Sequence, residues 1–170
     1  MSALKDLLVI DASAGKPGAV AAMLLADNGA RVVRLDNSRK FSDPDPLYSI
    51  YDRGKEFVDI SIEETERFNF LLSKADVLIE DFGQFHDIDS GSRFSELSGM
   101  NPGLIHCSIS AYGTKGDLRG KDQDADLVKA RLGMYDATPG FRDGHIYIVH
   151  PLVEIGTGIL AAQGVAAGLY

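Results

Sequence analysis

Positive charge and cysteine are both scarce in this sequence. Acidic residues outnumber basic ones by 25 to 17, and the net charge of −8 argues against nucleic acids and anionic membrane surfaces as partners. The one cysteine, Cys107, excludes an internal disulfide and is typical of a protein in a reducing cytoplasm. Because Cys107 falls within an expected strand, we interpret it as a buried, unreactive thiol.

Targeting and metal-binding patterns are also missing. Lys5 and Asp6 stand before a short apolar run, which is not the layout of a signal peptide, so we expect a cytoplasmic protein. The four histidines show no metal-ligand spacing, and we predict no metal site. The apolar stretch from residue 155 to 170 is too short to span a bilayer, and its small residues predict a core helix.

The rest of the sequence is typical of a single α/β domain over residues 1–170, because 45% of the residues are hydrophobic. Gly29 stands where a helix needs a C-terminal cap, and Ser61 with Glu64 forms a capping box. We expect strands at residues 7–11, 31–35, 57–60, 77–80 and 104–109, and helices at 19–28, 61–74 and 92–98. This alternation predicts a doubly wound, mainly parallel, Rossmann-like sheet with the first strand inside it.

Ligands of such sheets bind beyond the carboxyl ends of the strands. The loops that begin there are residues 13–18, 81–83 and 110–116, together with Asp36. The glycines of the third loop either line a ligand cleft or only form tight turns.

Glu154 is the first candidate for chemistry. It stands at the start of the apolar helical stretch, and Gly156 and Gly158 after it leave room for a bulky substrate. The unpaired N–H groups of a helix start also stabilise negative charge. The alternative is an acid that only complements the helix dipole.

Several segments occur in an order that resembles a known family. They include Leu7-Leu-Val-Ile-Asp11, Tyr51-Asp-Arg53-Gly54-Lys55, Ala75-Asp-Val-Leu-Ile-Glu80, Asn101-Pro-Gly-Leu-Ile and the segment around Glu154. Together they resemble the family III CoA-transferases, which include formyl-CoA transferase, carnitine CoA-transferase and the α-methylacyl-CoA racemases. The resemblance covers nearly the whole chain but only the N-terminal part of a family member, so it implies a truncated version of the family's large domain.

The resemblance also implies a set of site residues. Glu154 occupies the position of the family's catalytic aspartate, and it keeps the acid while adding a methylene group. No cofactor is implied beyond coenzyme A (CoA) and acyl-CoA, which are substrates. The positions that the resemblance places at CoA are Ser13, Lys16, Arg53, Lys55, Asp81, Phe82 and Gly113.

Three further departures from the family pattern bear on function. Asp81 stands in place of an asparagine near CoA, which predicts weaker binding of this anionic ligand. The first loop lacks an arginine of the family, for which Lys16 is a nearby substitute. Ala125 stands where racemases carry a histidine directly before an aspartate, which argues against racemisation.

The activity that the resemblance implies is the transfer of CoA between an acyl-CoA and a carboxylic acid, through an acyl anhydride on Glu154. One alternative is a non-catalytic subunit or domain that only binds CoA or a partner chain. Another is a nicotinamide enzyme, because Gly15 and Gly18 follow the first strand and Asp36 ends the second, although the full glycine fingerprint is missing. Calorimetric titration with CoA and with NAD separates these three hypotheses.

The interlocked dimers of the family suggest that this chain also assembles. We expect a homodimer, or a complex with a partner CoA-transferase chain, that buries residues 155–170.

Overall fold

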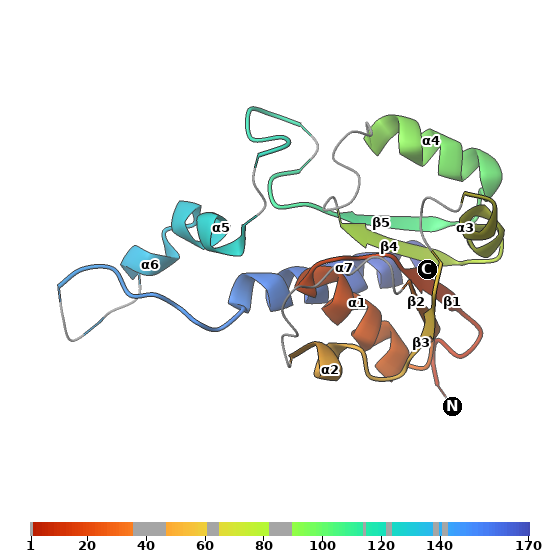
Figure 1. The fold of residues 1–170 in the computed structure, drawn as a ribbon, viewed down its shortest axis with the longest axis horizontal. Helices are drawn as coiled ribbons and strands as arrows, with labels where there is room; N and C mark the ends of the chain where they lie inside the picture. Colours follow the sequence, from red (N-terminus) through yellow and green to blue (C-terminus); the bar gives the residue numbers. More distant parts are fainter. Residues whose placement is uncertain are drawn as a thin grey trace.

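The computed structural model describes residues 2–35, 47–60, 65–81, 90–113, 115–121, 124–137, 140 and 143–170. A five-stranded sheet forms its centre, and every neighbouring pair of strands is parallel (Figure 1). The strand order is β3-β2-β1-β4-β5. The strands are β1 (Leu8–Asp11), β2 (Arg31–Leu35), β3 (Lys55–Val58), β4 (Val77–Asp81) and β5 (Ile105–Ile109). The predicted parallel sheet with β1 in its interior is confirmed.

Helices cover both faces of the sheet. They are α1 (Lys16–Asp27), α2 (Leu47–Tyr51), α3 (Thr65–Leu72), α4 (Ser90–Met100), α5 (Ala125–Arg131), α6 (Met134–Ala137) and α7 (Leu152–Leu169). Side chains alternate along each strand, so Val9 packs with α1 and α7 on one face, while Ile10 packs with α3 and α4 on the other. This is the doubly wound arrangement that the sequence predicts.

The element boundaries differ from the expectations by a few residues. Helix α1 begins at Lys16 instead of residue 19, because Pro17 fits the first turn of a helix. Gly29 has a φ of 94°, which confirms it as a residue suited to the chain reversal after α1. Helix α2 lies between the second and third expected strands, where we expected no helix. The capping box at 61–64 lies outside the described residues.

Helix α7 packs by one face only. Gly158 and Val165 are buried, whereas Leu152 and Leu160 are exposed, so the expected core helix is covered on a single side in the described chain. Its 18 residues have a mean hydropathy of 1.5, so by length and composition alone α7 could cross a membrane. This differs from the expectation that the apolar stretch is too short to do so. Core helices of soluble proteins also meet this criterion, and α7 packs against α1 and β5.

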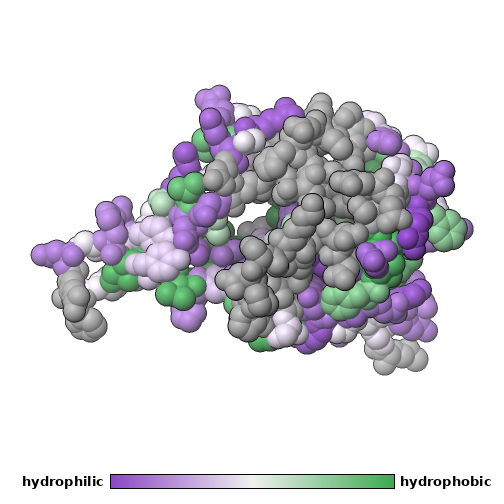
Figure 2. All heavy atoms as spheres, in the orientation of Figure 1, coloured by the Kyte–Doolittle hydropathy of each residue, from purple (hydrophilic) through white to green (hydrophobic). Residues whose placement is uncertain are grey.

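An arm made of α5, α6 and residues 143–150 extends away from the sheet (Figure 1). On its surface, apolar side chains lie among hydrophilic ones (Figure 2). The exposed large apolar residues among the described positions of the arm are Leu127, Leu132, Tyr147 and Val149. The arm returns to the sheet at α7 and so brings α5 close to the carboxyl ends of the strands.

Candidate active site

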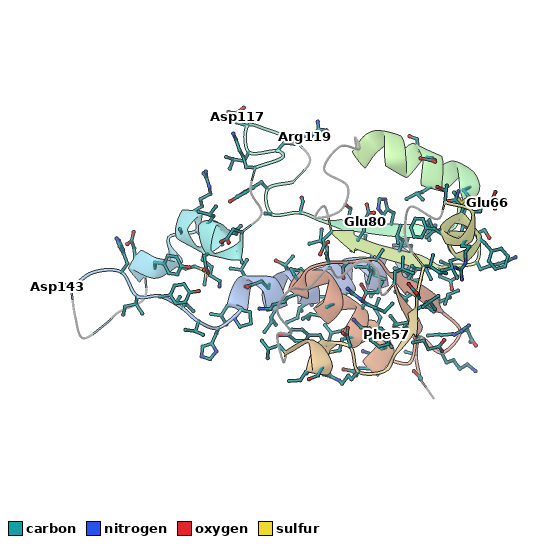
Figure 3. The ribbon with its side chains drawn as sticks, viewed as in Figure 1. Phe57, Glu66, Glu80, Asp117, Arg119 and Asp143 are labelled. Atoms are coloured by element: carbon teal, nitrogen blue, oxygen red, sulfur yellow. The ribbon has the colours of Figure 1, made fainter. Side chains whose placement is uncertain are left out.

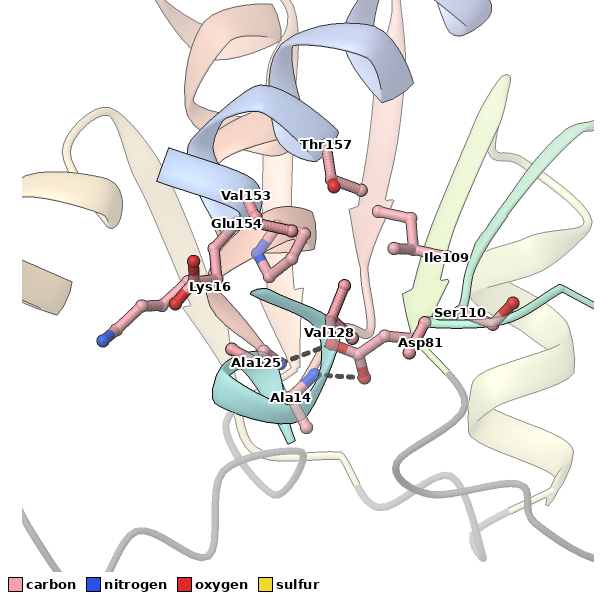
Figure 4. Close-up of a pocket in the computed structure, with 13 residues that line it drawn as sticks. Ala14, Lys16, Asp81, Ile109, Ser110, Ala125, Val128, Val153, Glu154 and Thr157 are labelled. Atoms are coloured by element: carbon pink, nitrogen blue, oxygen red, sulfur yellow. Dashed lines mark hydrogen bonds between the residues drawn. The ribbon is translucent and has the colours of Figure 1, made fainter. Parts of the chain in front are cut away.

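A cavity of about 460 Å³ lies at the carboxyl edge of the sheet (Figure 4). The loop between β1 and α1, the ends of β4 and β5, helix α5 and the start of α7 form its walls. It therefore occupies the place where open α/β sheets bind ligands. The lining residues are Ala14, Gly15, Lys16, Pro17, Asp81, Ile109, Ser110, Ala111, Ala125, Val128, Val153, Glu154 and Thr157.

Asp81 fixes the β1–α1 loop on one side of the cavity. Its Oδ1 accepts a hydrogen bond from the Ala14 N–H at 2.8 Å, and its Oδ2 accepts one from the Gly15 N–H (Figure 4). A Cβ at Gly15 would lie 2.8 Å from Asp81 Oδ2, so a larger residue here would force the Asp81 carboxylate to shift. Burial raises the pKa of the Asp81 carboxyl, although the two N–H donors act in the opposite direction.

A buried charge cluster around Asp11 also holds the β1–α1 loop, through Ser13. Asp11 Oδ2 is 2.7 Å from Arg34 Nη1 and 2.8 Å from Lys55 Nζ, and Asp11 Oδ1 accepts from Ser13 Oγ at 2.6 Å. Burial alone would raise the pKa of Asp11, but the charges of Arg34 and Lys55 outweigh it and lower this pKa to about 2. The cluster therefore joins β1, β2 and β3 through an ionised carboxylate.

Glu154 faces the cavity from the first turn of α7 (Figure 4). Its side chain is 13% exposed, and its Oε1 lies 3.8 Å from Lys129 Nζ on α5. Within the described part of the chain, the buried Oε2 has no hydrogen-bond partner. The carboxylate is therefore oriented by one cation and has an oxygen available for a ligand.

Lys129 connects Glu154 to a polar group on the arm. Its Nζ donates to Asp126 Oδ1 at 3.2 Å, and the same carboxylate accepts from Tyr135 at 3.0 Å and from Tyr147 at 2.9 Å. The hydrogen bonds from Tyr147 and Lys129 lower the pKa of Asp126. The pKa of Tyr135 is raised to about 12 by desolvation and by its bond to Asp126. The group therefore favours an ionised Asp126 between two protonated phenols.

Three of the predicted site residues meet at the cavity: Lys16, Asp81 and Glu154. Gly113 lies nearby, where its N–H donates to the cavity residue Ser110 at 3.0 Å. Phe82 lies outside the described residues.

The other predicted CoA ligands lie elsewhere. Ser13 and the side chain of Lys55 have no exposed surface, because both belong to the Asp11 cluster. Arg53 Nε donates to Asp27 at 3.1 Å on the surface. A direct contact of Ser13 or Lys55 with CoA would require the Asp11 cluster to open. The basic residues Arg53 and Lys55 instead form ion pairs within the protein, with Asp27 and Asp11. Their role in CoA binding stays a prediction.

Lys129 and Asp126 were not predicted as site residues. Their spacing of three residues on a helix indicates a pair with each other. Nothing in the local sequence connects Lys129 with Glu154. The two residues come together only because the chain turns back from the arm into α7.

The remaining titratable candidates lie away from the cavity. His106 Nε2 is 2.7 Å from Glu80 Oε1, and Glu80 extends from β4 on the face that α3 and α4 cover (Figure 3). His145 pairs with Asp136 on the exposed arm. Cys107 is half-buried instead of fully buried as expected, but its partial burial raises the pKa of the thiol, which supports the interpretation of this residue as unreactive. Among the residues that the structure describes, no group of His, Cys, Asp or Glu could hold a metal ion.

Known proteins resemble this chain in sequence and in structure. The family model for CoA-transferase family III matches residues 4–170. The acetyl-CoA:oxalate CoA-transferase of Acetobacter aceti is 32% identical over 96% of this chain and 46% of its own length. The succinyl-CoA:mesaconate CoA-transferase of Haloarcula marismortui is also 32% identical, over 100% of this chain and 48% of its own length.

Solved structures agree with this similarity. A hypothetical protein from Mycobacterium tuberculosis superimposes with a TM-score of 0.82 at 25% identity, over 99% of this chain and 50% of that one. A CaiB/BaiF family protein from Brucella suis, at 23% identity, has the same fold with a TM-score of 0.79 over 99% of this chain and 49% of that one. The chain thus spans about half the length of the relatives that it matches. The family match over residues 4–170, together with the two relatives that are 32% identical over nearly all of this chain, leads to one conclusion: the chain belongs to CoA-transferase family III.

Proposed function

We propose that this protein takes part in moving CoA between an acyl-CoA and a carboxylic acid, with Glu154 as the nucleophile. The observation that carries the proposal is the environment of Glu154, whose Oε2 has no hydrogen-bond partner in the described chain beside a cavity of about 460 Å³. The named relatives act on acetyl-CoA with oxalate and on succinyl-CoA with mesaconate. These names support a CoA thioester and a carboxylic acid as the two substrate classes.

The first half of the proposed reaction forms a thioester on the protein. The Glu154 carboxylate attacks the thioester carbonyl, the C–S bond breaks, and CoA departs as the thiolate, so that a mixed anhydride of Glu154 and the acyl group remains. The thiolate then attacks the Glu154 Cδ, which releases the acyl group as a carboxylate and leaves a glutamyl-CoA thioester. In each step one anion attacks and another anion leaves, so no proton has to be transferred.

The second half repeats these steps with the acceptor. The acceptor carboxylate attacks the glutamyl thioester and displaces the CoA thiolate, which forms a second anhydride. The thiolate attacks the acceptor carbonyl, and the Glu154 carboxylate is the leaving group. The acceptor departs as its CoA thioester, and Glu154 is regenerated.

The glycines after Glu154 supply space, while their amides serve the helix. Gly156 and Gly158 lie inside α7, where each N–H bonds the carbonyl four residues before it. The oxyanion is therefore assigned to the N–H groups of Val153 and Glu154 in the first turn, because the Leu152 N–H already donates to the His150 carbonyl at 2.8 Å. Nothing lies within 4 Å of a Cβ built on Gly156, so a substrate has access beside the nucleophile.

A non-catalytic subunit that only binds CoA or a partner chain is the second candidate. It is favoured by Asp81, whose carboxylate accepts the N–H groups of Ala14 and Gly15 at the start of α1. An anionic ligand at this helix start would meet a carboxylate instead of free amides.

Substitution of Glu154 tests the proposed reaction. In the protein at its native length, Glu154→Gln should abolish transfer with little change in stability, and Glu154→Asp should retain activity because it keeps the carboxylate. Mass spectrometry after incubation with an acyl-CoA and hydroxylamine should find a hydroxamate at Glu154. The matched control is Glu66→Gln, because Glu66 is exposed on α3 (Figure 3). Full turnover by Glu154→Gln would remove this residue from the mechanism.

A further inference from the structure

We propose that Lys129 is a positioning residue for Glu154, which it holds in the orientation for attack on the thioester. The inference rests on the proposed function, because it assigns a task to a second residue of the same site. Lys129 itself does not line the cavity in the described chain. It acts on the reaction through the carboxylate that does.

The burial of the pair is the first argument. The Lys129 side chain is 4% exposed and that of Glu154 is 13% exposed, although Lys129 comes from α5 and Glu154 from α7. Lysine is almost never buried to this extent without a charged partner. A lysine that only served helix α5 would keep its ammonium group in water. The position of Lys129 therefore requires the carboxylates that surround it.

The unequal distances are the second argument. Lys129 Nζ lies 3.2 Å from Asp126 but 3.8 Å from Glu154 Oε1. The longer distance is an ion-pair contact without a short hydrogen bond, so it attracts the carboxylate without occupying its lone pairs. Glu154 is thus oriented while it stays available as a nucleophile.

The charge balance is the third argument. Before the reaction one ammonium group faces two carboxylates, those of Asp126 and Glu154. When Glu154 becomes an anhydride it loses its charge, and Lys129 then forms a balanced pair with Asp126. Tyr135 and Tyr147 hold Asp126 in place through both of its oxygens. The cation therefore has a partner in every state of the proposed cycle.

Replacement of the lysine should slow the acylation of Glu154 and leave substrate binding intact. For Lys129→Met we expect kcat to fall by about 10- to 100-fold, the loss that accompanies a displacement of about 1 Å in a reacting group. The KM for acyl-CoA should change by less than about twofold, since Lys129 does not line the cavity. Lys129→Arg keeps the charge and should recover most of kcat. Lys74→Met removes an exposed lysine beyond α3 and is the matched control.

Chemical rescue separates positioning from a structural role. Lys129→Ala should regain activity with added propylammonium, which restores a cation at the site, and should not respond to propanol. If Lys129 only supported α5, Lys129→Met and Asp126→Asn would lower the melting temperature alike, and propylammonium would restore nothing. That result would overturn the proposal.

Single-turnover labelling distinguishes this inference from the proposed function itself. The rate at which hydroxylamine traps acyl-Glu154 should be lower in Lys129→Met than in the wild type. Equal labelling rates would overturn the role of Lys129 and leave the nucleophile in place. An absence of label at Glu154 in the wild type would overturn the proposed function, and the positioning role with it.

Discussion

Gly158 on α7 lies directly against Val20 on α1. A Cβ built on Gly158 would be 2.7 Å from the Val20 Cβ and 2.7 Å from the carbonyl oxygen of Pro17. Because part of this contact is backbone, Gly158→Ala forces the two helices apart. We expect it to lower the free energy of unfolding by about 1 to 3 kcal/mol, as measured by urea denaturation.

The matched control is Gly164→Ala on the same helix. Nothing lies within 4 Å of a Cβ built at Gly164, so only the helix propensity changes. Alanine is favoured over glycine by about 1 kcal/mol in a helix, and Gly164→Ala should therefore stabilise the protein. Equal effects of the two substitutions would contradict the close contact between α1 and α7.

Acid should weaken the fold through Asp11. The pKa of this carboxyl is about 2 in the folded protein, below its ordinary value of 3.8, so ionised Asp11 stabilises the fold at any pH above about 4. This contribution, about 2 kcal/mol, is lost as the pH falls from about 4 toward 2. Urea denaturation across this range should show the decline.

Asp11→Asn removes the charge at every pH. Arg34 and Lys55 then lose their shared carboxylate while they stay buried, which costs about 3 to 5 kcal/mol. The pH dependence between 4 and 2 should also become shallower in this variant. A variant as stable as the wild type at neutral pH would show that Asp11 does not hold the cluster together.

Asp81 should weaken the binding of CoA. Its carboxylate lines the cavity at the start of α1, where phosphates are otherwise favoured. We expect Asp81→Asn to bind CoA about tenfold more tightly in calorimetric titration, which corresponds to about 1.4 kcal/mol.

The pH dependence gives the same prediction a second readout. Burial raises the pKa of Asp81, so this carboxyl gains a proton at a higher pH than an ordinary aspartate. Protonation removes the repulsion, and CoA should bind the wild type more tightly as the pH falls through that range. Asp81→Asn should lack this component, whereas titration of the CoA phosphates affects both proteins equally. Identical pH profiles would indicate that CoA lies away from Asp81.

The exposed face of α7 should be covered in solution. Leu160 is 68% exposed and Leu152 is 54% exposed, on a helix with mean hydropathy 1.5. We expect a dimer or a larger assembly by light scattering at micromolar concentration, and Leu160→Glu should dissociate it. A monomeric wild type would contradict this expectation.

The fold was predictable because its patterns are local. The apolar run of β1, the reversal at Gly29 and the apolar β4 each follow from a few neighbouring residues, and the parallel sheet follows from their alternation. Helix α2 was missed because a single turn in a polar, proline-containing segment has no periodicity to recognise.

The site was only partly predictable, because charge alone does not reveal burial. Lys55 looks like a phosphate ligand in the sequence, but its ammonium is buried beside Asp11, a residue 44 positions away. Lys129 is the opposite case. Its sequence context suggests no function, but the fold brings it within 3.8 Å of Glu154. Glu154 was singled out from its position before two glycines together with the family resemblance, and the structure places it on the cavity wall, while its role as nucleophile stays a prediction.

The Asp11 cluster also bears on the order in which the protein forms during synthesis. Asp11, Arg34, Lys55 and Asp81 are all in place once the first four strands have been made, whereas Glu154 follows roughly 70 residues later. At ordinary rates of translation this interval lasts about 4 to 15 s. The residues of α7 that cover the apolar side of α1 in the folded structure are made only after this interval, so until then this side of α1 lacks its partner helix.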